Sequence, residues 1–465
     1  MAIPYVWNEI KGIEKLLALI PEIDILVVSP KKYKFNLSES KPSDVSRFAI
    51  YSPLVRSLHM FKTAYSTYKI PNWDTFITRC GSPTAYFSLP NLRCMVADSF
   101  YCSIGDHIKW LTLFLSPRLV ELQLWPNNHQ RIRWMPQFKA VTEAAADIAR
   151  HCPSLQTLSI LTRPDKTNEN TPSPASGSIL YGHIAGLRCL RELTIERQTV
   201  DSASLAKIGG LPCLETLIIF DSFNWPKLVP LSEQLSKAAF PSLRHLQLRK
   251  IRLLEVYRIW QIKSLVEHLT HVVIQVAVRV VDISTISSLL SVLSRSSQSV
   301  QELCLMSDSN QPEIISLDFQ NWHDVHILPL QSLKLVGVSV SKPTLVYFEQ
   351  LAKLCPRLRR LEVADTKIGL ADLCHITHYL KELEHLSITV IWNETAPHPI
   401  YSSGSLVTLE CNDAVQVSQK LNAQTIAVYL STIWPNLRNL RSVNTIMPTN
   451  RDRKVLRQLS EILSK

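Results

Sequence analysis

The sequence predicts an α/β solenoid, in which a short strand and a helix alternate from one coil to the next. The first observation is an internal repeat, which is clearest in the stretch Cys355-Pro-Arg-Leu358-Arg-Arg-Leu361-Glu-Val363. Its repeat phrase is an apolar residue, two variable residues, an apolar residue, one variable residue and an apolar residue. The second observation is helical periodicity between copies of the phrase. A strand with one apolar face cannot bury that face alone, so stacked neighbours must cover it.

Fifteen copies of the repeat phrase can be traced, at a mean spacing of about 30 residues, which leaves room for a strand, a helix and loops in each coil. The first three and the last two copies fit the phrase loosely. The copies begin at Ile23, Val55, Leu92, Leu119, Leu155, Leu190, Leu214, Leu243, Leu269, Val300, Leu330, Leu358, Leu383, Leu406 and Leu437.

The segments between the strands predict helices with one apolar face. In one of them, Val141, Ala144, Ala145 and Ile148 recur at helical spacing, and the pattern stops before Pro153. The same periodicity predicts helices over residues 231–239, 283–293, 344–354, 370–380 and 423–433. We therefore expect a curved solenoid, a horseshoe or arc with parallel strands on its concave side and helices on its convex side.

Three regions follow from this pattern. Residues 1–20 come before the repeats and include an amphipathic run that ends at Pro21. Residues 21–450 are expected to form the solenoid of about 15 irregular repeats. Residues 451–465 have apolar positions at helical spacing and predict a C-terminal capping helix.

Composition bounds the class of protein. The chain has 465 residues, of which 46% are hydrophobic and 19% charged, so it can bury a long core and is unlike a disordered chain. The stretch from Leu16 to Val28 is interrupted by Pro21, Glu22 and Asp24, so no membrane span is expected. The start lacks the pattern of a signal peptide, and ten cysteines without a C-x-x-C pair are typical of reduced thiols. We expect a cytoplasmic or nuclear protein.

The sequence contains none of the motifs that would predict an enzyme. Its eleven glycines form neither a dinucleotide-binding nor a P-loop motif, and no G-x-S-x-G or H-E-x-x-H motif occurs. We therefore expect no catalytic residue and no cofactor. Cys374 and His378, at i and i+4 of a predicted helix, have metal-ligand spacing. Two ligands do not make a zinc site, so a packed thiol beside a surface imidazole is the simpler interpretation and no metal is expected.

The predicted strands instead offer a surface. The second, third and fifth residues of each repeat phrase should point away from the core, and their charges are of both signs. Although the net charge is +11, the basic residues are mostly scattered, which favours a protein or peptide partner over nucleic acid. The alternative is a solvated face that binds nothing. The residues predicted to contact a partner on the concave face are Arg191, Glu192, Arg244, His245, Lys334, Arg359, Arg360, Glu362, Glu384 and His385.

Three tryptophans follow predicted strands and are candidate loop anchors for a partner: Trp125, Trp225 and Trp392. The alternative is that each ring covers the edge of the core.

The chain resembles leucine-rich-repeat proteins. The extended form of their repeat, L-x-x-L-x-L-x-x-(N/C/T/Q)-x-L, is best met by residues 358–368 and by residues 190–200, where Gln198 is the polar ninth residue. In the family, this residue ties the loop of one coil to the next. Most copies here lack it, so we expect irregular curvature.

Pro4, Trp7 and Ile10 form a Pro-x-x-Trp-x-x-Ile phrase that resembles the end of the F-box-like domain in leucine-rich-repeat proteins of mushroom-forming fungi. In that family the F-box binds a Skp-type adaptor of a cullin ubiquitin ligase, and the repeats select the substrate. The resemblance implies a substrate-recognition subunit of an SCF-type ligase or a truncated relative. The helices that precede this phrase in the family are missing here, so adaptor binding is expected only if an upstream segment completes the F-box. The alternative is a free-standing leucine-rich-repeat scaffold or sensor with no ligase link.

Overall fold

The computed structural model describes most of the chain, which forms two compact units, unit 1 (Met1–Leu243) and unit 2 (Arg244–Lys465). The described residues are 3–21, 23–37, 46–63, 67–70, 89–97, 104–124, 138–162, 174–221, 235–277, 283–307, 315–317, 322–340, 344–391, 405–411, 423–442, 458–459 and 461–463.

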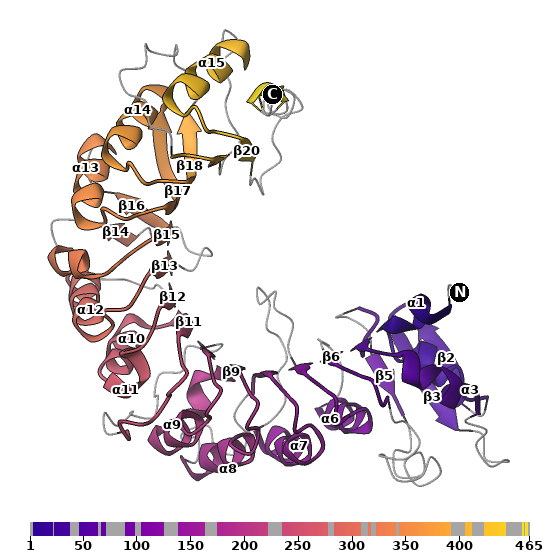
Figure 1. The fold of residues 1–465 in the computed structure, drawn as a ribbon. Coiled ribbons are helices and arrows are strands. Elements are labelled where there is room, and N and C mark those ends of the chain that lie inside the picture. The colour runs from indigo at the N-terminus through magenta and orange to yellow at the C-terminus, as the bar shows by residue number, and fades with distance from the viewer. Residues whose placement is uncertain are drawn as a thin grey trace. The chain divides into compact units, whose positions relative to one another are not determined.

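Each unit is an α/β solenoid of the leucine-rich-repeat kind, as the sequence predicted, with parallel strands on one side and helices on the other (Figure 1). In unit 1, seven neighbouring strands pair in parallel: β1 (Glu9–Lys11), β4 (Ser57–His59), β6 (Cys94–Val96), β7 (Glu121–Gln123), β8 (Thr157–Ile160), β9 (Glu192–Glu196) and β10 (Thr216–Phe220). In unit 2, eight strands do so: β11 (His245–Ile251), β12 (His271–Val276), β13 (Glu302–Ser307), β15 (Ser332–Val336), β17 (Arg360–Gly369), β18 (His385–Ile391), β19 (Thr408–Cys411) and β20 (Asn439–Ser442).

Helices and short 3-10 turns connect these strands. Unit 1 contains α1 (Ile3–Asn8), α2 (Glu14–Leu17), α3 (Ser46–Tyr51), η1 (Ser52–Leu54), α6 (Ile104–Leu113), α7 (Phe138–His151), α8 (Pro174–Ile184), η3 (Arg197–Thr199) and α9 (Ser202–Gly209). Unit 2 contains α10 (Leu253–Trp260), α11 (Lys263–Val266), α12 (Ile283–Ser296), η5 (His323–Ile327), α13 (Thr344–Leu354), α14 (Leu370–Tyr379) and α15 (Ala423–Ile433), and the short parallel pair β14 (Ile315–Leu317) and β16 (Val338–Val340).

The repeat phrase has a fixed relation to these strands. Fourteen of the fifteen predicted copies coincide with a strand, and each of these strands begins two residues after the first apolar residue of its phrase. The second apolar residue then occupies the same level in every coil. In unit 2 this level is a buried row formed by Leu246, Val272, Leu303, Leu333, Leu361, Leu386, Leu409 and Leu440. Stacking of equivalent apolar residues thus builds a continuous core.

The copy predicted to begin at Ile23 is wrong. This segment is β2 (Ile23–Ser29), which pairs antiparallel with β3 (Lys32–Leu37) in a separate sheet that ends with β5 (Thr67–Lys69). Leu26 and Val28, which the phrase would bury, are 48% and 66% exposed. Only two residues separate Ser29 from Lys32, and the chain reverses there. A turn this short can join antiparallel strands, whereas parallel strands need a much longer crossover connection.

The first coil is formed instead by β1. Ile10 is paired in register with Leu58 of β4 and is buried. Trp7 stands two residues before the strand, where the first apolar residue of the other copies stands, and stacks on Tyr51 with ring centroids 4.6 Å apart. The third apolar position of this copy is occupied by Gly12, whose φ is +91, so the chain turns there. This copy therefore does not match the repeat phrase.

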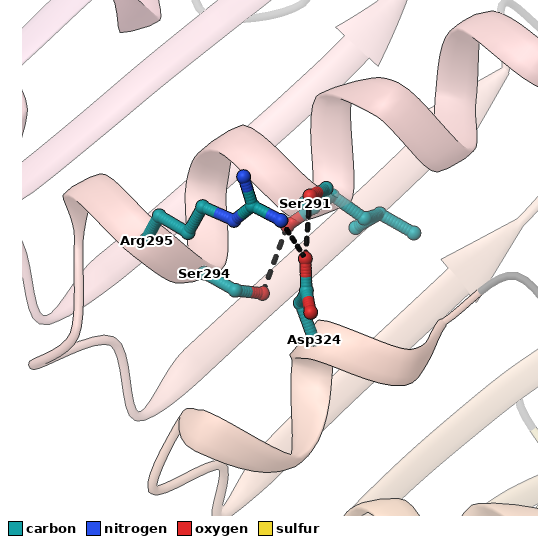
Figure 2. A network of polar contacts seen from close by, with 5 residues as sticks. Ser291, Ser294, Arg295 and Asp324 are labelled. Carbon is teal, nitrogen blue, oxygen red and sulfur yellow. Dashed lines mark hydrogen bonds and ion pairs between the residues drawn. The ribbon is translucent and has the colours of Figure 1, made fainter.

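Polar contacts connect successive coils behind the strands. The buried amide of Gln198 donates to the backbone carbonyl of Thr162 across 2.9 Å, which confirms the role expected of a polar ninth residue. On the helix side of unit 2, Asp324 of η5 accepts a hydrogen bond from Ser291 of α12 (2.5 Å) and pairs with Arg295 (3.1 Å), as Figure 2 shows. The buried indole N–H of Trp260 donates a hydrogen bond of 3.2 Å to the hydroxyl of Ser297.

Five of the six predicted helices are present. The exception covers residues 231–239: its described part, residues 235–239, forms turns. Near the C-terminus, residues 458–459 and 461–463 are helical and Leu459 is buried, while the rest of the predicted capping helix lies outside the described residues. No helix in the described ranges has the length and apolar character that crossing a bilayer requires.

Candidate partner-binding surface

The strands of unit 2 present two rows of outward side chains, which we call the unit 2 strand face. They are the first and third residues of each strand, and they alternate with the buried row because successive side chains of a strand point to opposite faces. The first row is His245, His271, Glu302, Ser332, Arg360, His385, Thr408 and Asn439. The second row is Gln247, Val273, Cys304, Lys334, Glu362, Ser387, Glu410 and Arg441, of which Ser387 is buried.

Glu362 is the centre of the charged part of this face. Its Oε2 lies 2.5 Å from Nζ of Lys334 on the neighbouring strand, and its Oε1 lies 2.5 Å from a guanidinium nitrogen of Arg360 on its own strand. Burial by itself would raise the pKa of Glu362, but the hydrogen bonds from Lys334 and Arg360 outweigh it and hold the pKa below its ordinary value. This carboxylate is therefore ionised at neutral pH.

His385 lies beside this cluster. Its Nε2 is 3.5 Å from Oε2 of Glu410 on β19, and both side chains are 17% exposed. Partial burial, followed by the positive charge of Arg360, lowers the pKa of His385, although Glu410 opposes the shift. A neutral imidazole can accept as well as donate a hydrogen bond, so this position offers a partner either kind of contact.

A second group lies on the first strands of unit 2. The rings of His245 and His271 are 4.1 Å apart between centroids, and His271 Nε2 is 3.1 Å from Oε1 of Glu302. The Nδ1 atom of His271 is 2.8 Å from the hydroxyl of Thr270. The two imidazoles and Glu302 thus form a row of polar contacts across three strands.

The structure keeps all ten predicted contact residues accessible and distributes them over both units. Eight lie in unit 2, either in its two rows or, for Arg244, Arg359 and Glu384, in the residue before a strand. Arg359 pairs with Glu384 across 3.8 Å. Arg191 and Glu192 lie in unit 1, where Arg191 pairs with Glu215 across 3.2 Å.

His271 and Glu410 were missing from the predicted set, although they contact its members His245 and His385. Glu302 was also missing, and it pairs with His271. Each of the three occupies the third or fifth position of a repeat phrase, so the signal was present. Cross-strand neighbours become visible only when the register is known.

Of the remaining predicted sites, Trp125, Trp225 and Trp392 lie outside the described residues. Pro4 and Trp7 belong to α1 and Ile10 to β1. Cys374 is buried in α14 and His378 is exposed. Within the described ranges, no three His, Cys, Asp or Glu side chains come together as a group that could hold a metal ion.

The charges on the unit 2 strand face are mostly matched across or along strands. Lys334 and Arg360 face Glu362, and Arg359 faces Glu384. Glu302 and Glu410 lie beside the imidazoles of His271 and His385. A nucleic-acid surface would present a continuous excess of cations to phosphates. This alternation of sign fits a polypeptide, which carries both charges and hydrogen-bonding groups.

Comparisons with known proteins return structural similarity at low sequence identity. No family model matches the chain, and a search of curated proteins gives no significant match. The chain is similar to an internalin from Listeria monocytogenes, with 16% identity over 80% of this chain and 79% of the other and a TM-score of 0.33. It is also similar to a protein from Bacteroides fragilis, with 13% identity over 48% of this chain and 66% of the other and a TM-score of 0.27.

Proposed function

We propose that this chain is a protein-binding module that engages a partner polypeptide on the unit 2 strand face. The observation that carries the proposal is the charged cluster of Lys334, Arg360 and Glu362 beside His385 and Glu410. These side chains are held in place by one another on paired strands, so a partner meets a preorganised surface. The proposed role is binding without catalysis.

Affinity capture from cells with charge-reversed variants tests the surface. Arg360→Glu replaces an exposed cation at the cluster and brings a second acid next to Glu362. We expect wild-type protein to capture a defined partner, and R360E to lose it by tenfold or more, because a like charge at an interface is strongly unfavourable, by roughly several kcal/mol.

Lys263→Glu is the matched control, because Lys263 lies on helix α11 and its side chain is 83% exposed. K263E should capture the same partner as wild type. Circular dichroism melting of all three proteins establishes that they fold. Equal capture by R360E would contradict the proposal, because the partner would then bind elsewhere.

A finer proposal gives the module a place in a ubiquitin ligase of the SCF type, as the subunit that selects the substrate. Its support is the match of Pro4, Trp7 and Ile10 to the end of an F-box-like domain, together with the repeats that follow. The test is co-purification with a Skp-type adaptor and a cullin, comparing this chain with one extended upstream. Recovery from the extended form alone would make the present chain a truncated receptor.

The competing proposal is a free-standing scaffold or sensor with no ligase link, acting in the cytoplasm or nucleus. Free thiols are compatible with such a reducing compartment, since the described cysteines form no disulfide. This alternative is favoured if neither the original nor the extended chain binds the adaptor while the R360E variant still loses the captured partner.

A further inference from the structure

Two exposed cysteines occupy the same place in neighbouring coils of unit 1. Cys189 and Cys213 each stand one residue before the first apolar residue of a repeat phrase, which is Leu190 in one coil and Leu214 in the next. Of the eight cysteines that the structure describes, these two are the exposed ones. Oxidation of a thiol requires access from solvent, and both cysteines have it.

The backbone takes the same course around the two cysteines. Three residues after each cysteine, Glu192 of β9 and Thr216 of β10 are paired in register. Neighbouring strands lie about 4.8 Å apart, and a disulfide needs Cα atoms roughly 4.4–6.8 Å apart, so the stacking of the two coils suits a disulfide. Each cysteine lies in a two-residue turn between buried leucines, which are Leu187, Leu190, Leu211 and Leu214.

Side chains at this place in the coil extend onto the neighbouring coil. Ser242 has the equivalent position in the coil after Cys213, and its hydroxyl donates to the carbonyl of Pro212 across 2.6 Å. Earlier in unit 1, Asn91 has this position, and Arg118, which has it one coil later, donates to the side-chain oxygen of Asn91 across 2.7 Å. The thiols of Cys189 and Cys213 are therefore placed side by side.

We infer that Cys189 and Cys213 form a reversible disulfide that fastens the coil of β9 to the coil of β10. The oxidant is a small disulfide such as oxidised glutathione. One cysteine thiolate attacks it, so that a mixed disulfide forms and one glutathione thiolate leaves. The second cysteine thiolate then attacks the protein sulfur of the mixed disulfide and releases the other glutathione. Two protein thiols are oxidised, one glutathione disulfide is reduced to two thiols, and the two cysteine protons pass to the two glutathiones.

The bond would act on the hydrogen bonds that begin the pairing of β9 with β10. The backbone N–H groups of Glu215 and Thr216 both donate to the carbonyl of Arg191, at 2.8 and 2.9 Å. Arg191 and Glu215, each two residues after a cysteine, also form an ion pair on the strand side of unit 1. A covalent link beside these contacts opposes local separation of the two coils. This site is separate from the unit 2 strand face, and reversibility suits an exposed disulfide in a reducing compartment.

Thiol trapping after equilibration with mixtures of reduced and oxidised glutathione tests the inference. We expect the full chain to remain a monomer and to lose two hydrogen atoms in mass as the oxidised fraction rises, and dithiothreitol should reverse the change. Trypsin cleaves after Lys207, so Cys189 and Cys213 fall on different peptides, which the disulfide should join. Hydrogen exchange at the amides of Glu215 and Thr216 should slow several-fold in the oxidised form.

Single serine variants separate a paired site from two independent exposed thiols. Cys189→Ser and Cys213→Ser each keep one thiol of the pair, so each should accumulate a mixed disulfide with glutathione that nothing resolves. Cys304→Ser, at a half-buried cysteine on β13, is the matched control and should form the internal disulfide as wild type does. Melting curves under reducing conditions establish that each variant folds.

Three results would overturn the inference. The first is wild-type protein that carries glutathione on both cysteines without forming a bond between them. The second is a disulfide that joins either cysteine to a second molecule or to another cysteine of the chain. The third is an internal disulfide that leaves exchange at Glu215 and Thr216 unchanged, because the bond would then not fasten the coils.

Discussion

Lys334 on β15 and Glu362 on β17 form an ion pair between neighbouring strands, with Nζ and Oε2 2.5 Å apart. The two residues are 28 positions apart in sequence but are direct neighbours in register. Since Arg360 contacts the same carboxylate, one acid holds two cations in place on the unit 2 strand face. Its ionisation is therefore coupled to both the stability and the charge of the proposed binding surface.

Glu362→Gln should lower the free energy of unfolding by roughly 1 kcal/mol at pH 7, since the pair is partly exposed and screened. The folded pKa of Glu362 lies below the ordinary value of 4.5, so its ionised form stabilises the fold above that value. The difference between wild type and E362Q should shrink as pH falls from about 4.5 through the lowered pKa. Urea unfolding at several pH values measures it. Glu384→Gln, at an exposed pair 3.8 Å long, is the control and should change stability by less than about 0.5 kcal/mol.

Ser291→Ala should raise the carboxyl pKa of Asp324. The hydrogen bond from Ser291 is the largest single cause that holds this pKa below its ordinary value, and the charge and hydrogen bond of Arg295 also lower it (Figure 2). Carbon NMR of labelled aspartate follows the titration directly. Ser299→Ala, at an exposed residue beyond the end of α12, should leave it unchanged. An unshifted pKa in S291A would mean that the serine does not hold the carboxylate in solution.

Gln198→Ala should destabilise the protein by roughly 1–3 kcal/mol, because it leaves the buried carbonyl of Thr162 without its donor. Thermal or urea unfolding measures the loss. Gln156→Ala removes an exposed amide from an outward position and should stay within about 0.5 kcal/mol of wild type. Equal effects at the two positions would show that the contact between coils adds no stability.

Trp260→Ala should cost roughly 3–5 kcal/mol, since it empties a fully buried position on α10 and removes the hydrogen bond to Ser297. Trp260→Phe keeps most of the volume, so it should cost less and separate the hydrogen bond from the packing. Leu254→Ala, on the same helix at 57% exposure, is the control for a general loss of apolar area. A small effect of W260A would mean that the neighbouring coils collapse into the vacant volume.

The failures of prediction have physical causes. The segment from Ile23 has apolar residues at the phrase positions, but it pairs antiparallel with β3 in a separate sheet, where Leu26 and Val28 are exposed. Side chains alternate in the same way in parallel and antiparallel strands, so the apolar spacing could not separate the two pairings. The true first coil at Ile10 was hidden because Gly12 replaces the third apolar residue. In both cases the distinguishing signal was the turn, not the apolar pattern.

The sequence by itself determined the solenoid, the position of fourteen strands and the residues that face outward, because local apolar spacing dictates which side of each strand is buried. Tertiary structure decided which outward residues meet. The pairing of Lys334 with Glu362 and of His385 with Glu410 depends on the register between strands, which the stacking of equivalent apolar residues in the packed chain sets. It also decided that β2 leaves the repeat and presents an open edge, since pairing partners and exposure are properties of the packed chain.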